Sequence, residues 1–158
     1  MNAFSMARFA AFALPAALLG GAYISEYVFG LFPCEMCWWQ RWPHFAALGF
    51  AALAFAAPAP RLWVAFAALA IMVSGLIGGF HAGVEYGWWD GITGCAVIDP
   101  DRDIFDPAAV PLVRCDEAPF SFMGISLAGY NFLFSFVGGI AILGLLRNGN
   151  VGRNKRAN

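Results

Sequence analysis

The chain has 158 residues, enough for one domain. Hydrophobic residues make up 61% of it and charged residues 12%, against roughly 45–50% and about 25% in soluble domains. So few charges cannot cover a water-exposed surface, and so high an apolar content excludes disorder. The formal net charge of −1 gives no indication of a nucleic-acid partner. The composition therefore predicts an integral membrane protein.

Four apolar segments are long enough to cross a bilayer as helices, which takes about 20 residues each. They cover residues 9–29, 38–57, 62–80 and 125–146. The runs are too long and too uniformly apolar for the strands of a membrane barrel. Residues 58–61 form a tight turn that can join only antiparallel neighbours. We therefore expect an all-α membrane protein, a four-helix transmembrane bundle in a single domain spanning 1–158. An alternative for the first segment is a signal peptide, which would leave the other three spans unchanged.

The charges predict the orientation of the bundle. The N-terminus, the turn at 58–61 and the C-terminal tail carry only basic residues: Arg8, Arg61, Arg147, Arg153, Lys155 and Arg156. The carboxylates fall in the two other connections, about 30–37 with its flank and 81–124. By the positive-inside rule, both termini and the turn are cytoplasmic and the two loops face outward. Trp38, Trp39, Trp42, Trp88 and Trp89 fall near the outer boundary, as in an interfacial aromatic belt.

Small residues recur inside the predicted spans. Gly20-Gly21, Gly75 with Gly79, and Gly138-Gly139 are spaced to let helices approach closely. We expect a compact bundle and assign these glycines no chemistry.

All four cysteines, Cys34, Cys37, Cys95 and Cys115, fall in the outward-facing connections. That compartment is oxidising and permits disulfides, and four cysteines allow three pairings. Cys34 and Cys37 form a Cys-x-x-Cys unit, for which three functions are possible. Half of a zinc site would need two further ligands, yet the only histidines are His44, inside a predicted span, and His81. A structural disulfide there would close too short a loop to restrain the unfolded chain much. The third reading is a redox-active dithiol.

The residues around the Cys-x-x-Cys unit favour the redox reading. Pro33 is tolerated at a helix start, which places Cys37 in the first turn of the second span. A helix N-terminus stabilises a thiolate, and Arg41, four residues on, shares the face of Cys37. We therefore expect the reactive thiolate on Cys37. The alternative for Arg41 is a charge that snorkels to the membrane interface.

A thiolate at the edge of the bilayer can pass electrons to a lipid-soluble acceptor, and a quinone can reach that depth laterally. Arg41 could donate a hydrogen bond to a quinone carbonyl. The sequence holds no nucleotide-binding glycine loop and no haem-attachment Cys-x-x-Cys-His, so it indicates an exchangeable membrane acceptor and no metal.

These features resemble the DsbB family of bacterial inner-membrane disulfide-generating proteins over nearly the whole chain. The resemblance rests on four spans, on Pro33-Cys34-x-x-Cys37 opening the second, on Arg41, on His81 ahead of Cys95, and on Cys115 followed by Phe120 and Met123-Gly124-Ile125-Ser126-Leu127.

The resemblance implies a mechanism. A reduced periplasmic DsbA-type oxidase would attack Cys95 of a Cys95–Cys115 disulfide, Cys115 would exchange with Cys34, and Cys37 would face ubiquinone or menaquinone. By matching position, Arg41 and His81 would bind the quinone beside Cys37. His81 could equally be an interfacial histidine satisfied by solvent. The sequence leaves open whether residues 104–113 form a helix on the membrane surface, since Pro107 and Pro111 limit its length.

Three competing functions remain. A reductase of the vitamin K epoxide reductase type uses similar cysteines, but its Cys-x-x-Cys comes late in the chain, whereas here it opens the second span. A structural tetraspan protein with inert disulfides would need no arginine beside Cys37. A paralogous disulfide oxidase for one dedicated substrate cannot be separated by sequence.

Overall fold

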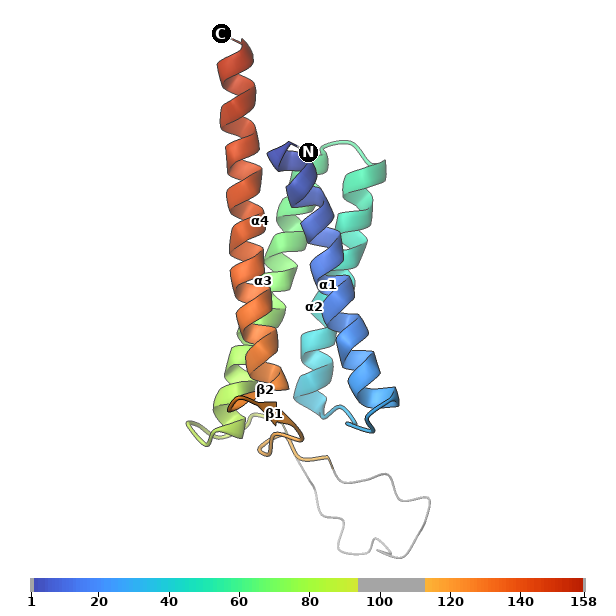
Figure 1. Ribbon diagram of the computed structural model, residues 1–158, viewed down its shortest axis with the longest axis vertical. Coiled ribbons are helices and arrows are strands. Elements are labelled where there is room, and N and C mark those ends of the chain that lie inside the picture. Colours follow the sequence, from blue (N-terminus) through green and yellow to red (C-terminus); the bar gives the residue numbers. More distant parts are fainter. Residues whose placement is uncertain (1, 94–112, 158) are drawn as a thin grey trace, which may run out of the picture.

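The computed structural model describes residues 2–93 and 113–157, with side chains to residue 148. Four long helices lie side by side: α1 (Ala3–Tyr27), α2 (Glu35–Ala56), α3 (Pro60–Glu85) and α4 (Leu127–Ala157) (Figure 1). A short antiparallel hairpin precedes α4, in which β1 (Ser121–Phe122) pairs with β2 (Ile125–Ser126). The described part of the chain is thus the expected all-α bundle with one small hairpin added.

The helices form a ring in which α3 packs against α2 and α4, and α1 packs against the same two helices. Figure 1 shows both termini and the α2–α3 turn at one end of the bundle. The α1–α2 connection and the hairpin lie at the other end, which we call the cysteine end because Cys34 begins α2 there. Residues far apart in sequence therefore meet at the cysteine end.

Three helical segments are long and apolar enough to cross a membrane: Ala3–Tyr27, Pro60–Glu85 and Leu127–Asn148. The helix α2 falls short of this standard, although it packs alongside the others. It carries Gln40, Arg41 and His44 among its apolar residues, and all three are buried. The bundle thus has a membrane protein's composition with one helix that carries polar groups inward.

Side-chain caps mark where α1 and α4 begin. Asn2 Oδ1 accepts a hydrogen bond from the Ser5 N–H at 2.7 Å, and Ser126 Oγ accepts one from the Gly129 N–H at 3.1 Å. Such side chains satisfy backbone donors that the first turn leaves unpaired. Before α4, Met123 and Gly124 have positive φ angles of 51° and 78°. Two successive positive φ angles are typical of the tight turn of a β-hairpin.

The helix boundaries differ from those of the predicted spans, and two of the differences bear on the site. The helix α3 continues to Glu85, so His81 lies within it and not in the following connection. The fourth helix begins at Leu127, because Ile125 and Ser126 pair with β1. Both differences arise at the cysteine end, where hydropathy alone does not mark where a helix stops.

Glycines let α3 approach α4 closely. A Cβ atom at Gly78 would lie 2.9 Å from Ala128 O, and one at Gly75 would lie 2.9 Å from Phe136 N. At both positions only the hydrogen atom of a glycine fits between the two helices. Gly20 and Gly21 on α1, by contrast, have nothing within 4 Å and do not mediate a helix contact among the described residues.

Away from the cysteine end, the bundle has a core made largely of alanine. Its buried members come from all four helices: Ala7, Ala11, Ala47, Ala51, Ala54, Val64, Ala67, Ala68, Ile71 and Ile142. Small side chains allow the helix backbones to pack closely, and these side chains carry no reactive group. The five tryptophans predicted near the outer boundary are all exposed on the protein surface, as an aromatic belt requires.

Candidate active site

Cys34 and Cys37 form a free dithiol at the start of α2. Cys34 is the N-cap residue, and its Sγ accepts a hydrogen bond from the Cys37 N–H at 3.3 Å. The two sulfur atoms lie 3.0 Å apart, well beyond the roughly 2.05 Å of a disulfide bond. Both thiols are free. The Cys-x-x-Cys spacing has therefore placed two sulfurs within hydrogen-bonding distance on one helical turn.

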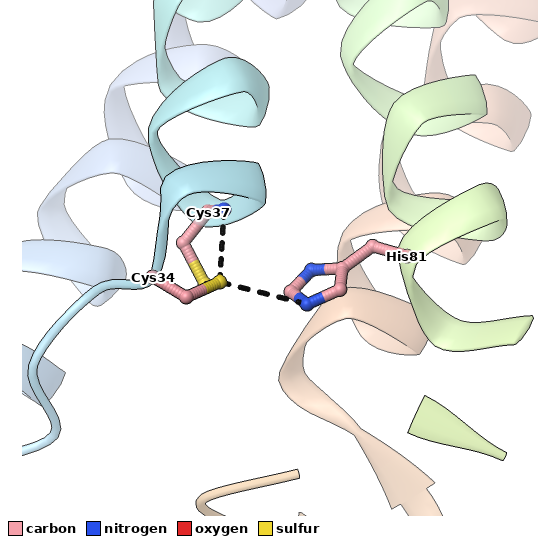
Figure 2. A group of neighbouring side chains, drawn as sticks. All are labelled: Cys34, Cys37 and His81. Atoms are coloured by element: carbon pink, nitrogen blue, oxygen red, sulfur yellow. Dashed lines mark hydrogen bonds between the residues drawn. The ribbon is translucent and has the colours of Figure 1, made fainter. Parts of the chain in front are cut away.

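His81 reaches this pair from the facing helix α3. Figure 2 shows its ring directed at the Cys34 sulfur, with Nε2 3.6 Å from Sγ. His81 is only 2% exposed. One turn further along α3, the Glu85 Oε1 atom lies 3.7 Å from the same nitrogen. The imidazole thus lies between a thiol and a carboxylate.

A hydrogen-bond chain determines which nitrogen of His81 carries the proton. Asn131 Nδ2 on α4 donates to Gln40 Oε1 at 2.9 Å, so the Gln40 amide group presents its Nε2 to His81. That Nε2 lies 2.8 Å from His81 Nδ1 and also donates to Met36 O. Because an amide nitrogen only donates, Nδ1 must accept. Nε2 is then the protonated nitrogen, and it faces Cys34.

These contacts favour the thiolate of Cys34. Its pKa is lowered to about 4, chiefly by the hydrogen bond from the Cys37 side chain, with further contributions from the hydrogen bond of His81 and from the Cys37 N–H. Burial acts in the opposite direction and raises the pKa. Donors close to sulfur stabilise its charged form more than burial destabilises it here.

Arg41 lines the same cavity as Cys37, but its guanidinium pairs with groups on α1. Its Nη1 donates to Glu26 Oε2 at 2.6 Å and its Nη2 to Ala22 O at 3.3 Å, both on α1. The guanidinium also stacks over the rings of Tyr23 and Trp38. The charge of Arg41 is therefore paired with a carboxylate. In this dithiol state the favoured thiolate is on Cys34, which differs from the sequence-based expectation of Cys37.

A cavity of about 280 Å³ lies beside the dithiol, walled by α1, α2 and α4 with two residues of α3. Cys37, Arg41 and His81 all line it, as do Gln40, His44 and Glu85. The rest of the wall is mainly apolar: Ala17, Leu18, Leu19, Gly21, Ala22, Ser25, Leu31, Phe32, Pro33, Pro119, Leu127, Ala128, Tyr130, Asn131 and Phe134. Mostly apolar walls with a few convergent polar groups are typical of small-molecule sites.

Cys115 lies close to the dithiol. It is disulfide-bonded and 2% exposed, and it packs in one buried cluster with Cys34, Met36 and Val84. Cys37 borders the same cluster. Cys95 lies outside the described residues, and so does the stretch 104–113 except for Val113. The structure thus brings together three of the four cysteines predicted as catalytic.

The ligand atoms of Cys34, Cys37 and His81 lie within 4.8 Å of one another, a spacing that a metal ion could bridge. A metal-bound histidine, however, presents a bare nitrogen to the ion and donates from the other. Here Gln40 donates to Nδ1, which leaves the proton on the nitrogen facing Cys34. The arrangement suits a thiolate better than a metal.

Sequence reasoning missed several polar residues that surround the site. Glu26 pairs with Arg41, and a buried chain of Gln40, Ser74, Asn131, Ser135 and His44 connects α2, α3 and α4. A signal was available, because polar side chains inside apolar helices are costly and mark functional or packing contacts. Their hydrogen-bond partners are up to 91 residues away in sequence, so the sequence could not show which side chains pair.

Comparison with known proteins decides the family. The family model described as "Disulfide bond formation protein DsbB" matches residues 5–145. The chain belongs to the DsbB family. It is also 28% identical over 153 residues to "Disulfide bond formation protein B" of Verminephrobacter eiseniae (strain EF01-2), covering 89% of this chain and 85% of that relative. No solved structure matches significantly.

Membership in the DsbB family assigns the chain a role in disulfide bond formation, as a disulfide-generating membrane oxidoreductase. The free dithiol beside a bundle cavity fits that chemistry. The reductase of the vitamin K epoxide reductase type and the inert tetraspan protein are correspondingly disfavoured.

Proposed function

We propose that this protein is a thiol:quinone oxidoreductase that re-oxidises a DsbA-type partner. The observation that carries the proposal is the free Cys34–Cys37 dithiol, whose second cysteine lines an apolar cavity together with Arg41 and His81. A reduced sulfur pair at the wall of a membrane-embedded cavity is placed to reduce a lipid-soluble acceptor.

The proposed relay begins outside the bundle. A thiolate of the reduced partner attacks Cys95 Sγ, the Cys95–Cys115 bond breaks, and Cys115 leaves as a thiolate. Cys115 then attacks Cys34 of an oxidised Cys34–Cys37 pair, and Cys37 leaves as a thiolate. The partner's second thiol releases the partner as a disulfide, and Cys95 re-forms its bond with Cys115. The packing of Cys115 in one buried cluster with Cys34 supports direct exchange between them.

The inner pair now holds both electrons as two thiols. A quinone supplies the chemistry of accepting two electrons and two protons, and the Cys34–Cys37 pair closes to a disulfide. Cys37 is the cysteine of this pair that lines the cavity, so it would face the acceptor. The two hydrogen bonds that Arg41 donates to α1 leave it further N–H groups for a carbonyl oxygen. His81 holds the Cys34 thiolate by hydrogen bonding and also lines the cavity.

The residues present fit such an acceptor. The cavity wall is mainly apolar, as a hydrophobic ring and tail require, and polar groups gather near Cys37. Either ubiquinone or menaquinone would match this chemistry. We further propose that the protein lies in the bacterial inner membrane, with both termini cytoplasmic and the cysteine end periplasmic, because the basic residues gather at the opposite end.

Quinone reduction by the purified protein tests the proposal. Reduced DsbA-type partner and ubiquinone or menaquinone are supplied, and quinone absorbance is followed. We expect turnover in the native protein, none with Cys37→Ser, and weakened quinone affinity with Arg41→Lys, because lysine cannot reproduce the planar guanidinium contacts. If neither quinone is reduced while the partner's thiols stay reduced, the relay is wrong and a dedicated-substrate oxidase becomes the better explanation.

A further inference from the structure

His44 is a buried polar group of the cavity wall to which the relay gives no role. His44 lies on α2, is 3% exposed and lines the same cavity as Cys37 and Arg41. Its Nδ1 is buried and has no hydrogen-bond partner among the described residues. An apolar side chain would pack at this depth without leaving a polar atom unsatisfied. The position therefore calls for a ligand other than the described residues of the chain.

The protonation of His44 follows from its partners on α4. Asn131 Nδ2 donates to Gln40 Oε1, Ser74 O and Ser74 Oγ, which leaves Asn131 Oδ1 as the acceptor. His44 Nε2 lies 3.0 Å from that oxygen and so carries the proton. In the neutral imidazole the other nitrogen, Nδ1, is then a bare acceptor. His44, a residue of the cavity wall, thus carries an unpaired lone pair at Nδ1 and no donor there.

A lone pair discriminates between the two redox forms of a quinone. The carbonyl oxygens of the oxidised form only accept hydrogen bonds, whereas the hydroxyl groups of the quinol can donate them. We propose that His44 Nδ1 accepts a hydrogen bond from a hydroxyl of the quinol and so favours the reduced product over the oxidised substrate in the cavity. This inference rests on the proposed function and adds a specificity residue to it.

The register of α2 places His44 suitably for this role. Cys37, Arg41 and His44 are spaced four and three residues apart, so they share one helix face. Seven residues of helix rise about 10 Å, which is comparable with a six-membered ring carrying a hydrogen bond at each end. Arg41 and His44 would therefore hold the ring from the same helix face that carries Cys37.

Equilibrium binding without turnover tests the inference. The full chain carrying Cys37→Ser is titrated in detergent with a short-chain ubiquinone and, separately, with its quinol, and quenching of tryptophan fluorescence reports binding. In this background His44→Leu should weaken quinol binding roughly three- to tenfold, the worth of one hydrogen bond, while the affinity for quinone changes little. His44→Asn should restore much of the preference, because its Oδ1 can stand where Nδ1 stood.

The outcomes distinguish a failure of the proposed His44 role from a failure of the proposed quinone-linked function. Equal losses for both ligands, or no loss in His44→Leu, would overturn the role of His44, because a merely structural histidine or one satisfied by water does not distinguish the redox forms. Thermal unfolding of each variant checks that it is folded. If the parent protein binds neither ligand, the quinone-linked function itself is wrong, which is a different result from a His44 variant that behaves like its parent.

Discussion

At the scale of single residues, the reactivity of the site depends on the contacts that Cys34 makes. Its sulfur accepts the Cys37 N–H and faces the protonated nitrogen of His81. The two cysteines lie at the start of α2, where the sequence predicted them. The sequence assigned the thiolate to Cys37 because Arg41 was expected to act there. The Glu26 carboxylate that pairs with Arg41 lies on another helix, and spacing within α2 could not reveal it.

The lowered pKa of Cys34 predicts how its reactivity depends on pH. The thiolate persists as pH falls below the ordinary value of about 8.5 and is lost only when pH falls through the lowered pKa. Between about pH 8.5 and pH 6.5 an ordinary cysteine loses roughly fifty-fold in thiolate, whereas Cys34 should lose less than about twofold. Iodoacetamide labelling of the reduced protein, read by peptide mass spectrometry, measures this profile.

His81→Leu provides the control for that profile. Removing the imidazole takes away the Nε2 donor, so the midpoint of Cys34 labelling should move up towards the ordinary pKa. A native profile that already has its midpoint near 8.5 would contradict the assignment of the thiolate to Cys34.

The ion pair between Arg41 and Glu26 predicts a further residue-scale effect. Both side chains are largely buried, at 7% and 12% exposed. Glu26→Ala leaves the guanidinium without its carboxylate and should lower the free energy of unfolding by roughly 3 kcal/mol. Glu26→Gln keeps an acceptor oxygen and should cost less. Denaturant unfolding in detergent compares the two variants, and equal losses would argue against a stabilising ion pair.

At the scale of elements, the contact between α3 and α4 positions both Gln40 and Asn131. A Cβ at Gly78 would meet Asn131 Nδ2 at 3.0 Å and Gln40 Oε1 at 3.1 Å. The sequence predicted small-residue packing along α3, and Gly75 and Gly79 indeed face α4 side chains or backbone. It could not show that Gly78 also leaves room for the hydrogen bonds that orient His81, because those bonds join three helices.

Gly78→Ala should therefore destabilise the bundle. Forcing a methyl group into this contact typically costs about 1–3 kcal/mol, and it should also slow the labelling of Cys34 at low pH by disturbing the His81 contacts. Gly49→Ala on α2 is the matched control, because nothing lies within 4 Å of that position. Thermal unfolding of the two variants decides: comparable melting temperatures would mean that the α3–α4 contact is not tight at Gly78.

At the scale of the whole molecule, hydropathy and charge predicted the bundle and its two chemically different ends. The structure places the termini and the α2–α3 turn at one end and the dithiol at the other (Figure 1). Two features could not be predicted: the hairpin that delays the start of α4, and the helical position of His81. Both depend on tertiary contacts, such as the hydrogen bond from Ser126 N–H to the Tyr86 hydroxyl at 2.9 Å.

The proposed orientation predicts which surface thiols a membrane-impermeant reagent can reach. In a cysteine-free background, Ile92→Cys at the cysteine end should be labelled by an impermeant maleimide on bacteria with a permeabilised outer membrane. Pro58→Cys in the opposite turn should be labelled only after the inner membrane is broken. Both positions are exposed in the structure. The reverse pattern of labelling would show that the bundle is inserted the other way round.

The central claim is that the Cys34–Cys37 dithiol passes its electrons directly to quinone. The most direct measurement uses the Cys95→Ser/Cys115→Ser double variant, whose inner pair is reduced chemically and freed of reductant before one addition of quinone. The account predicts that one quinone is reduced for each dithiol, that Cys34 and Cys37 end as a disulfide, and that a further Cys37→Ser change abolishes both. An inner pair that stays reduced in the presence of quinone would contradict it.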